Sequence, residues 1–214
     1  MISQPELKTH PLVQHSPLNT RDSLYGGRTE DTMLHYKIRE GEETIQYVDV
    51  MSLYPYICKY FKFPVGHSVI HVGDACQDKK VMLQKGLIKY SVLPPKRLYH
   101  PVLPFRCNNK LLFCLCKSCP TEKNLENECA HETVAERALT GTWVIDEVRL
   151  AVQKGYEVIE IFEVYEYDVT QYDPQTVQGG LFVEYINTFL KLKAEASGYP
   201  EWVRNPRRRG SLYR

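Results

Sequence analysis

The crowding of cysteines in the middle of the chain constrains the fold more than any other feature of the sequence. Four of the seven lie within thirteen residues: Cys107, Cys114, Cys116 and Cys119. Cys116, Cys119, Cys129 and His131 form a C-x2-C…C-x-H pattern. Three thiolates and one imidazole are the ligand set of a closed tetrahedral zinc site, so we predict structural Zn²⁺ here. The alternative is a group of buried free cysteines, and Cys114 is a competing ligand. The crowded cysteines suit reduced thiols or a bound metal better than a framework of disulfides, so we expect a reducing compartment.

The composition is that of a globular protein, with 43% hydrophobic, 11% aromatic and 25% charged residues among 214. It excludes a disordered or fibrous chain. A chain of this length buries roughly 70% of its unfolded surface, enough for one core and a small satellite module. No apolar run approaches the ~18 residues of a membrane span, and the first residues lack the pattern of a secretory signal. We therefore expect an intracellular protein without a membrane partner.

The net charge of +1 is unevenly distributed. Residues 189–214 hold seven Lys and Arg against two acidic residues, a net of +5, so the first 188 residues sum to −4. The basic tail, residues 204–214, is typical either of a segment that follows a phosphate backbone or of a solvated chain end.

The pattern of apolar, turn and capping residues predicts a mixed order of strands and helices without internal repeats. Residues 1–20 predict an extended lead-in with little core. A hairpin is predicted from the strand-like residues 33–38 and 44–50, with Asp49 at the end of its second strand. A short helix should follow, capped by Ser52 and ending before Pro64. Further strands are expected over 67–72, 86–93, 110–113 and 156–167, and helices over 142–154, ending at Gly155, and 181–196, ended by Gly198 and Pro200.

Asp49 lies directly before the predicted start of the short helix. This order predicts a cation site beside a phosphate site. A carboxylate in this position can ligate Mg²⁺, and the backbone N–H groups of Ser52 and Leu53 can receive a triphosphate as helix N-termini do. Tyr54 would offer a flat aromatic face beside the sugar. The alternative is that Asp49 caps the helix and Tyr54 packs in a core.

Residues 49–55, DVMSLYP, resemble motif A of family B DNA polymerases, D-x-x-S-L-Y-P. Residues 25–28, YGGR, resemble the Y-x-G-G element that precedes motif A by about twenty residues in the protein-primed branch of that family. The plain alternative for the glycine pair is a turn. Further stretches, at 86–95, 99–104, 140–156 and 191–200, resemble the polymerases of Maverick or Polinton transposons. The resemblance covers roughly residues 21–203.

The resemblance implies template-directed nucleotidyl transfer from deoxynucleoside triphosphates to a DNA primer by a two-metal mechanism. Asp49 would bridge two Mg²⁺ ions, and the backbone carbonyl of Val50 would complete the coordination of one. Ser52 and Leu53 would hold phosphates through their N–H groups. Tyr54 would stack under the incoming sugar and exclude a 2′-hydroxyl.

The resemblance also implies contacts with DNA and with a priming protein. Gly26 and Gly27 would let the backbone approach the template, and Arg28 would contact a phosphate. Lys193 is a weaker candidate for DNA contact, since a lysine on an amphipathic helix is usually part of its solvated face. The region between motif A and the fingers is where protein-primed polymerases bind a terminal protein, so the zinc-bearing insertion is a candidate for that contact.

Several family motifs do not occur in this sequence. It has neither a D-T-D hairpin (motif C) nor the fingers signature K-x-x-x-N-S-x-Y-G, and no D-x-E exonuclease pair precedes Gly26. We therefore expect a central polymerase fragment of mixed α/β (α+β) class that is inactive alone. Its expected parts are the lead-in 1–20, a palm segment with motif A at 21–64, palm strands with a zinc-knuckle insertion at 65–170, the start of the fingers at 171–203, and the basic tail.

Two rival hypotheses stay open at this stage. The chain could be a non-catalytic, zinc-dependent module that binds nucleic acid or protein and descends from a transposon polymerase. It could also be a decayed transposon copy without a selected function. A chain from a eukaryotic transposon would act in the nucleus.

Overall fold

The computed structural model describes residues 16–76 apart from Glu30, Thr32 and Leu34, together with residues 85–124 and 128–198. The chain forms two compact units. The first unit combines residues 1–28 with 66–168, and the second combines residues 29–65 with 169–214. None of the helices in the described ranges is long and apolar enough to cross a bilayer.

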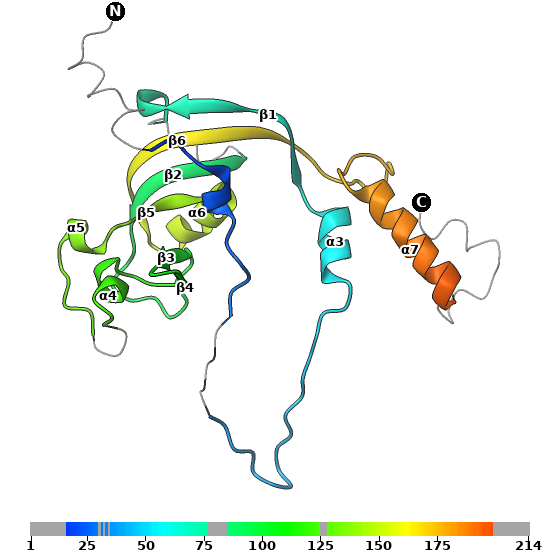
Figure 1. The fold of residues 1–214 in the computed structure, drawn as a ribbon, viewed down its shortest axis with the longest axis horizontal. Coiled ribbons are helices and arrows are strands. Elements are labelled where there is room, and N and C mark those ends of the chain that lie inside the picture. Colours follow the sequence, from blue (N-terminus) through cyan, green and yellow to red (C-terminus); the bar gives the residue numbers. More distant parts are fainter. Residues whose placement is uncertain are drawn as a thin grey trace, which may run out of the picture. The chain divides into compact units, whose positions relative to one another are not determined.

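The first unit is built on a four-stranded sheet (Figure 1). Its spatial order is β1 (Phe63–Val72), β6 (Glu157–Thr170), β2 (Gly86–Leu93) and β5 (Leu139–Val144). The central strand β2 runs antiparallel to both neighbours, β5 and β6. Helix α6 (Ile145–Gln153) follows β5 directly and packs against β5 and β2.

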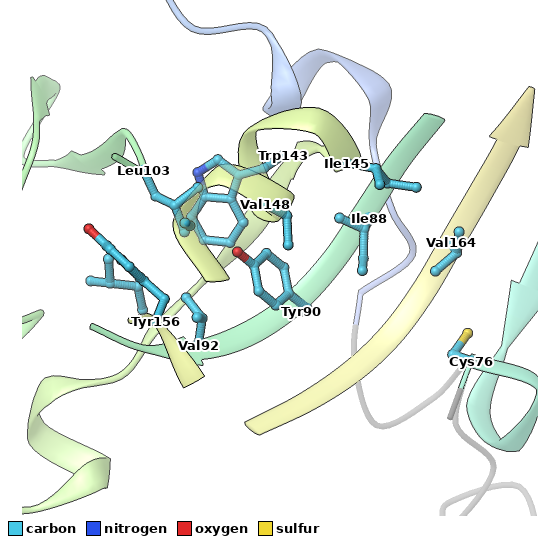
Figure 2. Close-up of a cluster of buried hydrophobic side chains, with 12 residues drawn as sticks. Cys76, Ile88, Tyr90, Val92, Leu103, Trp143, Ile145, Val148, Tyr156 and Val164 are labelled. Atoms are coloured by element: carbon cyan, nitrogen blue, oxygen red, sulfur yellow. The ribbon is translucent and has the colours of Figure 1, made fainter. Parts of the chain in front are cut away.

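Alternation along β2 places the core on one face of the sheet. Ile88, Tyr90 and Val92 are fully buried, whereas the residues between them are only partly buried. Trp143 of β5 lies edge-to-face on Tyr90, with ring centres 5.1 Å apart, and its indole N–H donates to the Pro104 carbonyl at 2.8 Å. Figure 2 shows these side chains gathered with other buried residues from α6 and the loop before β3.

A smaller lobe extends the first unit beyond the sheet. It contains the hairpin of β3 (Phe105–Cys107) and β4 (Lys110–Leu112) and two single-turn helices, α4 (Ser118–Thr121) and α5 (Val134–Arg137). The hairpin turns through two asparagines that both have positive φ, as tight two-residue hairpins require. A capping box between Thr133 and Glu136 starts α5. Two 3-10 turns, η1 (Thr20–Ser23) and η2 (Gly73–Cys76), complete the unit.

The second unit packs α3 (Leu53–Tyr60) against α7 (Val183–Ser197). The buried Lys59 side chain joins them, because its ammonium donates to the Asn187 Oδ1 at 2.7 Å. The same ammonium lies 5.4 Å from the ring centres of both Tyr60 and Tyr172. Burial lowers the pKa of Lys59, and the two aromatic faces partly offset the cost of keeping its charge there.

The mixed α/β class and most elements are confirmed. The strand expected over 86–93 coincides with β2, and the strands expected over 67–72, 110–113 and 156–167 correspond to β1, β4 and β6. The helix expected over 181–196 corresponds to α7, which ends at Gly198 with a φ of +84°. Pro200, the basic tail and the first fifteen residues lie outside the described residues.

Two boundary predictions are wrong. The helix expected from residue 142 begins at Ile145, because the preceding residues pair with β2 as strand β5. The lead-in is not without core contacts. Leu18 is buried, and its backbone N–H donates to the Glu163 carboxylate on β6.

The hairpin expected over 33–50 is also wrong in its strands. A turn does form after Arg39, whose carbonyl accepts from the Glu42 N–H at 3.1 Å. No strand occurs among the described residues 35–50, so Asp49 does not lie at a strand end. Most apolar side chains described in this segment are exposed, Tyr47 at 94%, so they add little packing that would hold two strands together. A two-stranded hairpin without such packing is marginal in water.

Candidate functional site

Residues 49–52 form an exposed turn that leads into α3, whose first residues, Leu53 and Tyr54, are also exposed. The Leu53 N–H donates to the Val50 carbonyl at 3.3 Å, which closes the turn. Ser52 occupies the N-cap position in a left-handed conformation with a φ of +61°, but its side chain makes no capping hydrogen bond. Pro55 lies in the first turn of α3, as predicted.

Neither structural alternative for this segment is realised. The cap of α3 is Ser52, so the exposed Asp49 carboxylate is not the helix cap. Tyr54 is 81% exposed and therefore does not pack in a core. The segment presents a carboxylate, a helix N-terminus and an aromatic ring to solvent, within six residues of one another in sequence.

Gly26 and Gly27 belong to the first unit, on an extended segment rather than a turn. Both are exposed, neither has a positive φ, and no atom lies within 4 Å of where a Cβ would stand. Local packing therefore does not require glycine at either position. A hollow of about 520 Å³ lies beside Gly26, lined by Arg106, the Asn108–Asn109 turn and Lys110 among others.

The residues on both sides of the glycine pair are firmly held. The Arg28 guanidinium donates to the Pro101 carbonyl at 2.7 Å and lies 4.4 Å from the ring centre of Phe113. The Tyr25 hydroxyl donates to the Thr142 carbonyl at 3.2 Å, and burial raises the pKa of Tyr25 to about 12. The two exposed glycines are thus presented between two anchored side chains.

The four predicted zinc ligands converge. Their ligand atoms all lie within 4.8 Å of one another. The His131 Nδ1 lies 3.5, 3.6 and 3.6 Å from the sulfurs of Cys116, Cys119 and Cys129. Tetrahedral zinc with bonds of about 2.3 Å to sulfur and 2.0–2.1 Å to nitrogen separates such atoms by about 3.5 Å. The geometry of the residues therefore fits Zn²⁺ at this cluster.

Two hydrogen bonds join the start of α4 to the end of α5 beside the cluster. The Lys117 N–H donates to the Arg137 carbonyl at 3.2 Å, and the Ser118 hydroxyl donates to the Glu136 carbonyl at 3.0 Å. Cys114 is not part of the converging group. Its thiol is partly buried, and burial raises its pKa to about 11.

One member of this centre was not predicted from the sequence. The Glu122 carboxylate lies 3.1 Å from the His131 Nε2, on the side of the ring opposite the sulfurs. A carboxylate in that position fixes the tautomer and orientation of a metal-binding imidazole. The available signal was an acidic residue three positions after Cys119, but such spacing is common and does not by itself indicate this role.

A buried carboxyl group lies near the tyrosines of the core. The Glu147 Oε2 and the Tyr90 hydroxyl are both buried without a hydrogen-bond partner among the described residues. Burial raises the pKa of Glu147, and it raises the pKa of Tyr90, with Glu147 as one of the charges that contribute. Glu147 lies in the first turn of α6, so its position follows from the helix start at Ile145.

Comparison with known protein families establishes the ancestry of the chain. Residues 7–205 match the family described as DNA polymerase type B, organellar and viral. The chain belongs to this polymerase family. No curated protein and no solved structure matches it. The reaction of a type B polymerase uses DNA and nucleotides as substrates, and the match includes both the Asp49 segment and the Cys–His cluster.

Lys193 is the last of the site residues that the sequence predicted. It is exposed on α7, directly before the buried Ala194 and two helical turns after the buried Ile186. That position suits both a DNA contact and an ordinary solvated helix face.

Proposed function

We propose that this chain supplies the motif A part of a protein-primed type B DNA polymerase of the Maverick or Polinton kind. One observation carries the proposal: Asp49 is exposed directly before the N-terminus of α3, with Tyr54 exposed in the first helical turn. In a chain of this family, a carboxylate, backbone N–H groups and an aromatic ring in that order suit a metal, a triphosphate and a sugar.

The proposed roles follow from the chemistry of each group. Two bound Mg²⁺ ions would stabilise the attacking and leaving oxygens of the transfer. Asp49 would hold both ions, and Val50 would add its carbonyl. Ser52 and Leu53 would direct their N–H groups at phosphate oxygens. The Leu53 N–H and the Val50 carbonyl bond to each other over 3.3 Å, a long hydrogen bond, so substrate binding would release both groups at small cost.

Tyr54 would stack beneath the deoxyribose and leave no room for a 2′-hydroxyl. Gly26 and Gly27 would let the template backbone approach closely, because a side chain at either position would occupy the approach path. Arg28 would add a phosphate contact while Pro101 and Phe113 hold its guanidinium in place. Lys193 would contribute a weaker electrostatic contact.

The Cys–His cluster would hold a structural Zn²⁺ ion. The ion would have four protein ligands and no open position, so it would organise the α4–α5 lobe rather than take part in catalysis. By its place between motif A and the fingers, this insertion within residues 65–170 is also the proposed contact for a terminal priming protein.

We further propose that the chain alone does not catalyse nucleotide addition, because a two-metal site needs a second carboxylate of the motif C kind. The test measures Mg²⁺-dependent binding of a fluorescent deoxynucleoside triphosphate. Asp49→Asn should abolish the Mg²⁺-dependent part of binding, whereas Glu40→Gln, an exposed acid in the same loop, should leave it unchanged. Equal binding by wild type and Asp49→Asn would remove Asp49 from the site. Primer extension by the purified chain that is lost in Asp49→Ala would refute its inactivity.

A second candidate function is a non-catalytic zinc-dependent module that binds nucleic acid or protein. The preassembled ligand geometry at His131 favours it, because the cluster is the most completely formed chemical site in the described residues. DNA binding that survives Asp49→Ala but is lost on chelation or in Cys116→Ser would support this function over the catalytic one.

A further inference from the structure

The loop from Pro94 to Pro104 is fixed at both ends by buried contacts. The Pro94 carbonyl accepts from the buried Arg137 guanidinium at 2.8 Å, and the Pro104 carbonyl accepts from the Trp143 indole at 2.8 Å. Leu103 is fully buried in the core of the first unit (Figure 2). Such a loop loses little further conformational entropy when a ligand binds.

The tip of this loop carries an aromatic and basic group on the surface. Tyr99 is 85% exposed, and its ring meets the His100 ring edge-to-face at 4.5 Å between centres. Arg97 is exposed two residues earlier, whereas its neighbour Lys96 forms an ion pair with Glu132. Most of the Tyr99 ring therefore faces solvent, where a ligand can reach it, on a loop whose two ends are held by buried contacts.

The chemistry of the tip selects the ligand. A free tyrosine face stacks on an unpaired base, and a nearby guanidinium meets the phosphate that follows it. Duplex bases are already stacked on one another and offer no such face. Arg97 also lines a hollow of about 600 Å³ that continues past Phe113 to the Cys–His cluster, which gives a strand a path along the lobe.

We propose that Arg97, Tyr99 and His100 form a contact site for single-stranded DNA, with a base on the Tyr99 ring and a phosphate at Arg97. This inference rests on the proposed polymerase function, for which the unpaired template strand is the single-stranded ligand. Its three residues belong to the first unit, whereas Asp49 belongs to the second.

The test is fluorescence anisotropy of a labelled single-stranded oligodeoxythymidylate titrated with the zinc-loaded full chain at several salt concentrations. Tyr99→Ala should weaken binding by about tenfold or more while leaving the salt dependence unchanged, because it removes stacking and no charge. Tyr99→Phe should bind as wild type. Arg97→Gln should lower the slope of log affinity against log salt by about 0.7, the value of one phosphate contact on a single strand.

The matched charge control is Arg149→Gln, which removes an arginine of the same unit that is ion-paired with Asp146 on α6. It should change neither affinity nor slope. The proposal is overturned if the wild-type chain does not bind the oligonucleotide, or if Tyr99→Ala and Arg97→Gln bind as wild type does. Either result leaves the nucleotide test at Asp49 unaffected, so failure of this contact is distinguishable from failure of the proposed function.

Discussion

The core of the first unit and the segment around Asp49 represent opposite physical situations within one chain. Ile88, Tyr90 and Trp143 are fully buried and contact each other across β2 and β5. Tyr47 and Met51 are 94% and 88% exposed, in a segment without strands. The difference shows that contacts within the described residues hold the sheet of the first unit together, whereas the side chains around Asp49 stay largely exposed there.

The largest effect should come from removing the metal. Chelation of a zinc-loaded chain, or Cys116→Ser, should unfold the α4–α5 lobe, since structural zinc contributes on the order of 10 kcal/mol to folding. Elemental analysis should find one zinc per chain in the wild type and none in the variant, and hydrogen exchange should accelerate over the lobe. Cys114→Ser is the matched control and should retain its zinc. Full protection of the lobe in the metal-free chain would contradict a structural role.

The second effect concerns the core itself. Trp143→Ala should destabilise the first unit by about 3–5 kcal/mol, because it leaves a large cavity beside Tyr90 and removes the hydrogen bond to Pro104. Urea unfolding followed by far-UV circular dichroism measures this loss. A change below about 1 kcal/mol would mean that the core is not the source of stability and would remove one side of the comparison.

A smaller effect should appear at Glu147. Burial raises the pKa of Glu147 in the folded state above its value in the unfolded state. The stabilising contribution of this carboxyl group is therefore fully present at low pH and is lost as the pH rises through the folded-state pKa. Glu147→Gln should therefore be more stable than wild type at pH 7, and the difference should vanish in acid below the unfolded pKa. Thermal melts from pH 4 to pH 8 measure it. Parallel melting profiles for the two proteins would show that the carboxyl is charged at no cost.

The smallest effect should come from the exposed segment. Met51→Ala should change the free energy of unfolding by no more than about 0.5 kcal/mol, since its side chain is almost wholly in solvent. The same urea melts measure it beside Trp143→Ala. A loss of 2 kcal/mol or more would mean that the Met51 side chain is buried in solution.

The sequence predicted those parts of the fold whose signals are local. The strand-forming residues that end at Pro94 predicted β2 over its full length, and the Cys–His spacing predicted which ligands meet. Val144 fits both a helical and a strand pattern. The start of α6 at Ile145 is therefore decided by the pairing of residues 139–144 with β2, which the sequence pattern does not reveal.

Features that depend on distant contacts could not be predicted in this way. The carboxylate of Glu122 beside His131 depends on how the lobe closes. The Arg28 guanidinium meets Pro101 and Phe113, more than seventy residues away in sequence. The strands of the hairpin expected over 33–50 did not form, and a two-stranded hairpin whose apolar side chains stay exposed is only marginally stable in water.

The close packing at β5 also has an evolutionary consequence. Gly141 lies under the Trp143 ring, and a Cβ there would stand 2.6 Å from the ring's Cη2 atom. The two positions cannot vary independently, because any side chain at 141 requires a smaller or displaced residue at 143. Among related polymerases, a substitution at one of these positions should be accompanied by a compensating change at the other, so the pair should stand out as correlated columns once many sequences are compared.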